Sequence, residues 1–122
     1  MAGFLTEAWL DDLERAAQRA ELDTKGALVL QQVIPDGPDG REVSYALVVR
    51  DGRVTLERGR VADPDLTFTQ DLATAEAIHR GELSAQAAFM QGRLRLGGDL
   101  RAVIERAAEL AAIDDVFASA RA

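Results

Sequence analysis

Residues 88–99 read Ala-Phe-Met-Gln-Gly-Arg-Leu-Arg-Leu-Gly-Gly-Asp, and they carry the signals of three successive elements. Gly92 is placed to end a short helix that Ser84 would cap. The alternation Leu94-Arg95-Leu96 predicts a strand with one apolar face. Asp99 is then placed to cap one long final helix. The apolar residues expected in that helix are Leu100, Val103, Ile104, Ala107, Ala108 and Ala111.

The segment before this stretch adds a strand and another short helix. Residues 66–70, Leu-Thr-Phe-Thr-Gln, follow a turn at Asp63-Pro64-Asp65 and predict a strand. Asp71 can cap a short helix that holds Ile78, and Gly81 can end that helix.

The first half of the chain predicts one helix and three strands. Residues 6–22 repeat apolar residues at steps of three and four, which indicates a helix. Residues 27–34 are apolar on both faces, as in a buried strand. Strands 43–50 and 53–58 should pair antiparallel, because Asp51-Gly52 suits a two-residue hairpin turn. Strands cluster early and helices late, so the predicted fold class is α+β.

The composition is that of an ordinary globular protein, and it excludes several function classes. The 122 residues, 48% of them hydrophobic, predict one domain over 1–122. A net charge of −7 argues against nucleic acid as a partner. The absence of Cys and the single His exclude disulfides, thiol catalysis and multi-His metal sites. No membrane span or signal peptide is evident, so a cytoplasmic protein is expected.

Three patterns suggest chemistry, and each has a simpler structural interpretation. His79 would need a positioned partner to act as a base, and an exposed helix residue is the favoured interpretation. Gly97-Gly98-Asp99 lacks the Lys-Ser/Thr of a phosphate-binding loop, which favours a turn and a cap. No calcium-loop spacing is found at Asp11/Asp12, Asp63/Asp65 or Asp114/Asp115. We therefore expect no cofactor, no metal and no enzymatic activity.

Three segments resemble the type-2 sterol carrier protein family, namely residues 65–70, 78–84 and 87–100. Ala88–Asp99 matches the family's most recognisable segment, with Arg93 and Arg95 in place of the usual lysines. The resemblance implies a five-stranded sheet with helices packed on one face, enclosing an apolar tunnel. It also implies binding of fatty acids, acyl-CoA, phospholipids or sterols without chemical change.

On this resemblance we expect apolar side chains of the sheet, the short helices and the final helix to line the tunnel. The predicted ligand-binding residues are Val33, Leu47, Phe68, Ile78, Leu83, Phe89, Met90, Val103, Ile104 and Phe117.

The sequence is compatible with two functions. The first is non-catalytic binding or transfer of a lipid by a bacterial protein, a source that the Ala- and Arg-rich composition indicates. The alternative is an accessory or interaction module of an enzyme or a homodimer, with no lipid transfer of its own. The expected partner is a small-molecule lipid and no nucleic acid, while transient membrane contact and the oligomeric state stay open.

Overall fold

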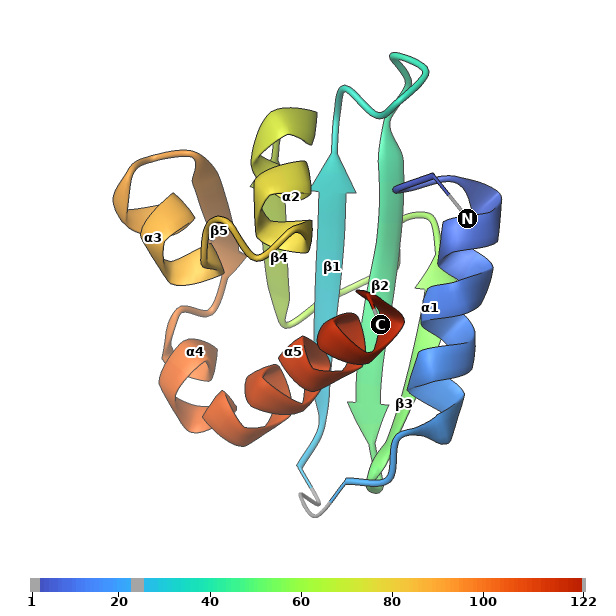
Figure 1. The fold of residues 1–122 in the computed structure, drawn as a ribbon. Helices are drawn as coiled ribbons and strands as arrows, with labels where there is room; N and C mark the ends of the chain where they lie inside the picture. The colour runs from blue at the N-terminus through green and yellow to red at the C-terminus, as the bar shows by residue number, and fades with distance from the viewer. Residues whose placement is uncertain (1–2, 23–25, 122) are drawn as a thin grey trace.

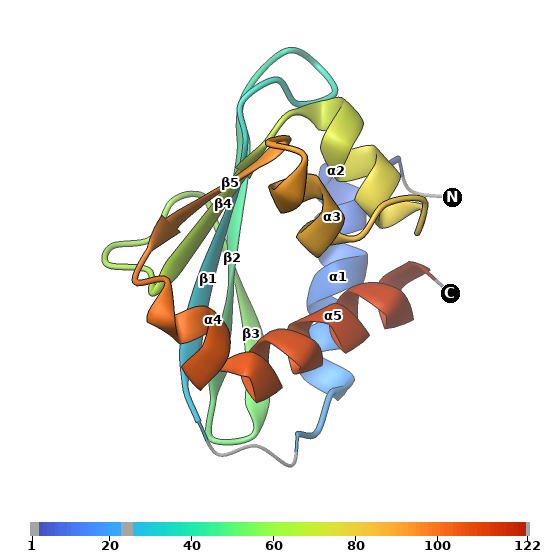
Figure 2. The same cartoon turned by 90° about the vertical axis from the view of Figure 1, so that its left-hand side faces the viewer.

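A five-stranded sheet forms one layer of the molecule, and most of the helices form a second layer on one of its faces (Figures 1 and 2). This computed structural model describes residues 3–22 and 26–121. The elements in chain order are α1 (Glu7–Arg19), β1 (Leu28–Ile34), β2 (Val43–Arg50), β3 (Arg53–Arg58), β4 (Leu66–Gln70), α2 (Leu72–His79), α3 (Ala85–Met90), β5 (Leu94–Gly98), α4 (Arg101–Glu105) and α5 (Ala107–Arg121).

The strand order is β3-β2-β1-β4-β5, so the mixed sheet has β1 at its centre. β1 pairs antiparallel with β2 and parallel with β4, and β4 pairs antiparallel with β5. The predicted hairpin of β2 and β3 is confirmed. Its turn residues Asp51 and Gly52 have φ of 53° and 76°, the positive values that a tight hairpin turn requires.

Each face of the sheet is covered by a different part of the chain. On the helix face, Leu28, Leu30 and Ile34 of β1 join Leu10 and Leu13 of α1 in the main apolar core. On the opposite face, the segment 59–65 connects β3 to β4, and β1 lies between these two strands within the sheet.

Gln31 holds this crossover segment against the sheet. Its Nε2 donates hydrogen bonds to the carbonyl oxygens of Tyr45 at 3.0 Å and Gly59 at 3.1 Å. Its Oε1 accepts a hydrogen bond from the backbone N–H of Val61 at 2.8 Å. The buried amide therefore hydrogen-bonds to backbone groups that have no partner in the hydrogen-bond ladder of the sheet.

The prediction of one long final helix was wrong. The chain leaves helical geometry at Arg106, with φ −113° and ψ 27°, and continues as α5. Ile104 and Ile113 are about two and a half turns apart, so a straight helix would point them to opposite sides. Ile113 is buried in the core and Ile104 is 82% exposed, an arrangement that this spacing gives with or without the break.

The predicted cap of that helix was also only partly right. Asp99 Oδ1 accepts a hydrogen bond from the N–H of Arg101 at 3.0 Å. The cap position itself is Leu100, which supplies no side-chain hydrogen bond. Beyond the break, α5 packs against α1 and crosses the helix side of the sheet (Figure 1). Within residues 3–22 and 26–121, every helix is too short or too polar to span a lipid bilayer.

Candidate functional site

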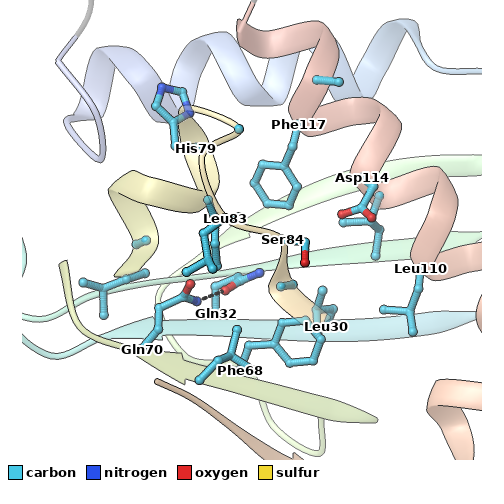
Figure 3. A pocket seen from close by; sticks show the side chains of 18 of the residues that line it. Leu30, Gln32, Phe68, Gln70, His79, Leu83, Ser84, Leu110, Asp114 and Phe117 are labelled. Atoms are coloured by element: carbon cyan, nitrogen blue, oxygen red, sulfur yellow. Dashed lines mark hydrogen bonds between the residues drawn. The ribbon is translucent and has the colours of Figure 1, made fainter. Parts of the chain in front are cut away.

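A pocket of about 560 Å³ lies between the sheet and its covering helices, and we call it the central pocket (Figure 3). Its floor comes from four strands and includes Leu30, Gln32, Ile34, Tyr45, Phe68, Gln70 and Leu94. Its walls come from α2, the connection between α2 and α3, and α5, and include Ile78, His79, Leu83, Ser84, Leu110, Ile113 and Phe117.

The wall made by α2 is fixed at its start by two carboxylates. Asp71 Oδ1 accepts a hydrogen bond from the N–H of Thr74 at 2.8 Å, and Asp36 Oδ1 accepts one from Leu72 at 2.8 Å. These N–H groups have no partner within the helix itself. The hydrogen bonds from Thr74 lower the pKa of Asp71, so the cap is ionised at neutral pH. The predicted cap at Asp71 is thus confirmed, and α2 presents its last turn to the pocket.

The rim next to α2 is built from a tight connection. Gly81 has a φ of 77° and follows the end of α2, as predicted. Ser84 Oγ accepts a hydrogen bond from the N–H of Ala87 at 3.0 Å and begins α3, also as predicted. Leu83 lies between these two residues and contributes to the pocket wall.

One end of the central pocket is an aromatic cluster. The rings of Phe4 and His79 stack at 4.4 Å between centroids, and Phe4 meets Trp9 edge-on at 5.0 Å. Tyr45 meets Trp9 at 5.9 Å and Phe117 at 6.5 Å. These contacts join α1, β2, α2 and α5 around one end of the cavity. The expectation of an exposed His79 was wrong, because Phe4 and Trp9 cover its ring.

Two buried amides stand on the apolar floor. Gln70 Nε2 donates a hydrogen bond to Gln32 Oε1 at 2.7 Å, and both residues are 7% exposed (Figure 3). Gln32 belongs to the central strand β1 and Gln70 to the neighbouring strand β4. A buried amide without a partner would lose several kcal/mol of solvation, so the pairing explains how two glutamines sit there.

The aromatic end also holds two buried polar groups. The indole N–H of Trp9 is buried and has no hydrogen-bond partner among the described residues. Burial raises the pKa of the Tyr45 hydroxyl well above its usual value, so it stays neutral across the physiological range. Both residues line the central pocket.

The charge of the central pocket is negative at its rim. Asp114 and Asp115 of α5 belong to the lining and are exposed. The described residues that line the pocket include no lysine or arginine. The pocket therefore combines an apolar interior, a few neutral polar groups and an acidic edge.

A second pocket of about 590 Å³ adjoins the first on the side of β5, and we call it the α3–α4 pocket. Phe68, Ala85 and Leu94 line both pockets, so these three residues separate them. The other lining residues are Gln86, Phe89, Met90, Leu96, Leu100, Val103 and Ile104. Met90 is 77% exposed, so this pocket lies at the surface.

The structure distributes the predicted ligand-binding residues over these two pockets. Those in the central pocket are Phe68, Ile78, Leu83 and Phe117. Those in the α3–α4 pocket are Phe68, Phe89, Met90, Val103 and Ile104. The predicted set is thus split between an inner and an outer apolar space.

Two predicted lining residues belong to neither pocket. Val33 is on the face of β1 opposite to Gln32 and Ile34, because successive side chains of a strand alternate. Val33 thus lies one position away from the residues that face the central pocket, on a strand that is buried on both faces. Leu47 faces the helix side opposite Leu30, but it is fully buried in the core.

The polar floor and the aromatic end of the central pocket are not among the features predicted from the sequence. Gln32 and Gln70 look like ordinary polar residues of predicted strands, and their pairing requires the order of β1 and β4. Trp9 and Tyr45 could have been found as large side chains on the apolar faces of a helix and a strand. Nothing local indicates that His79 would stack on Phe4.

Comparison with known proteins decides the family. The model of the family described as the SCP-2 sterol transfer family matches residues 7–108. The chain belongs to the SCP-2 sterol transfer family. This confirms the resemblance on residues 65–100 and extends it over the N-terminal strands. The α+β fold with a five-stranded sheet and helices is likewise confirmed.

Individual SCP-2 relatives resemble this chain in sequence or in fold. It is 30% identical over 67 residues to sterol carrier protein 2 of Gallus gallus, which is 55% of this chain and 12% of that relative. A crystal structure of sterol carrier protein 2 superimposes with a TM-score of 0.72 and 23% identity, covering 98% of both chains, which is a likeness of fold.

A segment of an enzyme has the same fold as this SCP-2 family chain. The double mutant of the sec-alkyl sulfatase PisA1 matches with a TM-score of 0.62 and 27% identity. The match covers 82% of this chain and 15% of the sulfatase. This fold therefore also occurs as one part of a much longer enzyme.

Proposed function

We propose that this chain binds a lipid in the central pocket and carries it without chemical change. The observation that carries the proposal is the cavity of about 560 Å³ with a predominantly apolar lining. That volume is within the usual range of ligand pockets, roughly 300–1,000 Å³. Membership of a family described as transferring sterols supports it independently.

The apolar tail of the lipid supplies the binding free energy. Each buried methylene contributes about 0.8 kcal/mol, so a chain of about 16 carbons gains roughly 13 kcal/mol before any cost is subtracted. Lost translational freedom and ordering of the chain offset a large part of this gain. Binding in the micromolar range, about −8 kcal/mol, is the expected result.

The α3–α4 pocket would have a different role from the central pocket. Exposed Phe89, Met90 and Ile104 form an apolar patch that water solvates poorly. We assign transient contact with a membrane to this patch, at the moment when lipid is loaded or released.

The less favoured alternative is an accessory module within an enzyme. Its support is the likeness to a segment of the sulfatase PisA1. In that case the central pocket would be incidental, and protein expressed in bacteria would carry no lipid.

The decisive experiment blocks the mouth of the central pocket. Ala118 of α5 is exposed and lines the pocket, whereas Ala111 lies two turns earlier on α5 and outside the lining. We expect Ala118→Trp to weaken binding of a fluorescent fatty acyl probe at least about tenfold, since its ring would occupy the opening. Ala111→Trp is the matched control and should bind like the unaltered chain.

Native mass spectrometry of protein expressed in bacteria gives an independent measurement. A stoichiometric lipid on the unaltered chain, absent from Ala118→Trp, supports the carrier. A lipid-free chain that also ignores the fluorescent probe contradicts the carrier and supports the accessory module.

A further inference from the structure

The buried amides of the central pocket keep hydrogen-bonding capacity that they do not use on each other. The bond from Gln70 Nε2 to Gln32 Oε1 uses one donor and one acceptor. It is the one hydrogen bond that these two side chains make within residues 3–22 and 26–121. An amide group has two N–H donors and a carbonyl oxygen, so one amino group and one carbonyl oxygen remain available.

The remaining groups face the pocket. Figure 3 shows the nitrogen of Gln32 directed away from Gln70, into the cavity on the side of Ser84. Exchanging oxygen and nitrogen in both amides would reverse the bond between them but would leave the same outward pair, one donor and one acceptor. The chemistry that the floor offers to a ligand is therefore independent of how the amides are assigned.

The surroundings of the pair disfavour an anion. The described lining residues include no lysine or arginine, and Asp114 and Asp115 stand at the rim. A carboxylate or phosphate placed at the amides would lose its hydration with no lysine or arginine of the described lining to replace it. The buried indole N–H of Trp9, which also belongs to the lining, is a neutral donor.

We propose that Gln32 and Gln70 make the central pocket selective for lipids whose polar group is neutral and both donates and accepts a hydrogen bond. A long-chain alcohol has such a group, and a fatty acid carboxylate does not. The hydroxyl donates to Gln70 Oε1 and accepts from Gln32 Nε2, while the hydrocarbon tail lies on Phe68 and Leu30. This inference rests on the proposed function, because it concerns the ligand class of the same pocket.

The first test uses the unaltered chain and lipids with equal tails. Oleyl alcohol, oleate and octadecene would each displace the apolar dye diphenylhexatriene, and the loss of its fluorescence gives the affinity. We expect oleyl alcohol to bind at least about tenfold more tightly than oleate at mildly alkaline pH. We also expect the affinity for oleic acid to rise as the pH is lowered toward the pKa of its carboxyl group.

The second test removes the amides. In the double variant Gln32→Leu/Gln70→Leu, the affinity for oleyl alcohol should fall about tenfold, since its hydroxyl loses two hydrogen bonds. The affinity for octadecene should stay unchanged or increase. Replacing both partners together avoids leaving one amide unpaired, which preserves the fold. Gln18→Leu, an exposed site on α1, is the matched control and should change neither affinity.

The outcomes separate this inference from the proposed function. Equal affinity for oleyl alcohol and oleate, or an equal response of alcohol and octadecene to the double variant, overturns the selectivity and leaves lipid binding intact. If none of the lipids displaces the dye, lipid binding fails and the selectivity fails with it. The comparison on the unaltered chain decides the matter even if the double variant does not fold.

Discussion

Tyr45 illustrates how the pocket changes the acid–base behaviour of a single side chain. Its ring lies between Trp9 and Phe117, and the residue is 3% exposed. Desolvation disfavours the tyrosinate anion and therefore raises the pKa of the hydroxyl. In the unfolded chain the same hydroxyl ionises near pH 10.

This difference predicts a loss of stability in alkali. Above about pH 10 the unfolded chain releases the Tyr45 proton while the folded chain retains it, so the free energy of unfolding falls as pH rises. Chemical denaturation of Tyr45→Phe, which cannot ionise there, should show a smaller fall over the same range. The chain has one tyrosine, so tyrosinate absorbance reports this site directly. Titration of Tyr45 at its ordinary pKa in the folded protein would contradict the prediction.

The burial and pairing of Gln32 and Gln70 could not be predicted from the sequence. Each has the polar character expected of a half-exposed strand residue, yet each is buried. Their contact depends on the parallel pairing of β1 with β4, which are separated by two intervening strands along the chain. Long-range pairing of this kind leaves no local signal.

At the scale of elements, the start of α2 is the most clearly specified feature. Asp71 caps the helix, and Asp36 from the turn after β1 supplies a second acceptor. The wall of the central pocket therefore depends on a contact between two parts of the chain that are distant in sequence.

Removing the cap should destabilise the fold by a defined amount. Asp71→Ala leaves the N–H of Thr74 without its acceptor, and we expect the free energy of unfolding to fall by about 1 kcal/mol near neutral pH. Asp71→Asn keeps an acceptor oxygen and should retain most of that stability. Urea denaturation measures both, and equal losses in the two variants would contradict the capping role.

The same cap has a pH dependence with a definite sign. The pKa of Asp71 is lowered in the folded chain, so its stabilisation is present above the unfolded value of about 3.9 and is lost as the pH falls through the lowered value. Asp71→Asn should lack this acid-dependent component.

The elements with strong local signals were predictable, and those decided by burial were not. The hairpin at Asp51-Gly52 and the caps at Asp71 and Ser84 appear where turn and cap chemistry places them. The break at Arg106 was missed because Leu100, Val103 and Ile104 have helical spacing, although they lie exposed. The spacing of apolar residues identifies a helix, but it does not show which of those residues are buried in the core.

At the scale of the whole molecule, the crossover segment 59–65 joins the two sides of the sheet. It leaves β3 at one edge and reaches β4 on the other side of the central strand. Gln31 fastens it through Gly59 and Val61. Arg60 pairs with Glu42, and Asp65 accepts a hydrogen bond from Val29. The rear of the sheet is therefore covered by a segment that one buried amide and two further, exposed side-chain contacts hold in place.

Gln31→Leu should weaken the fold more than an ordinary surface change. Backbone groups of Gly59, Val61 and Tyr45 would lose a partner in a largely buried setting, at a combined cost of about 2–3 kcal/mol in the free energy of unfolding. Denaturant titration measures the change, with Gln18→Leu as the exposed control, expected within about 0.5 kcal/mol of the unaltered chain. A loss for Gln31→Leu as small as that of the control would contradict the fastening role.

The closed face of the sheet has a consequence for how a ligand could exchange. Because the strands and the crossover segment close the rear of the sheet, a lipid bound as proposed would enter and leave the central pocket from the helix side, where α5 and the α2–α3 connection line it. If entry and exit share that side, a bound lipid would have to dissociate before the next one binds, and its residence time would limit the rate of exchange.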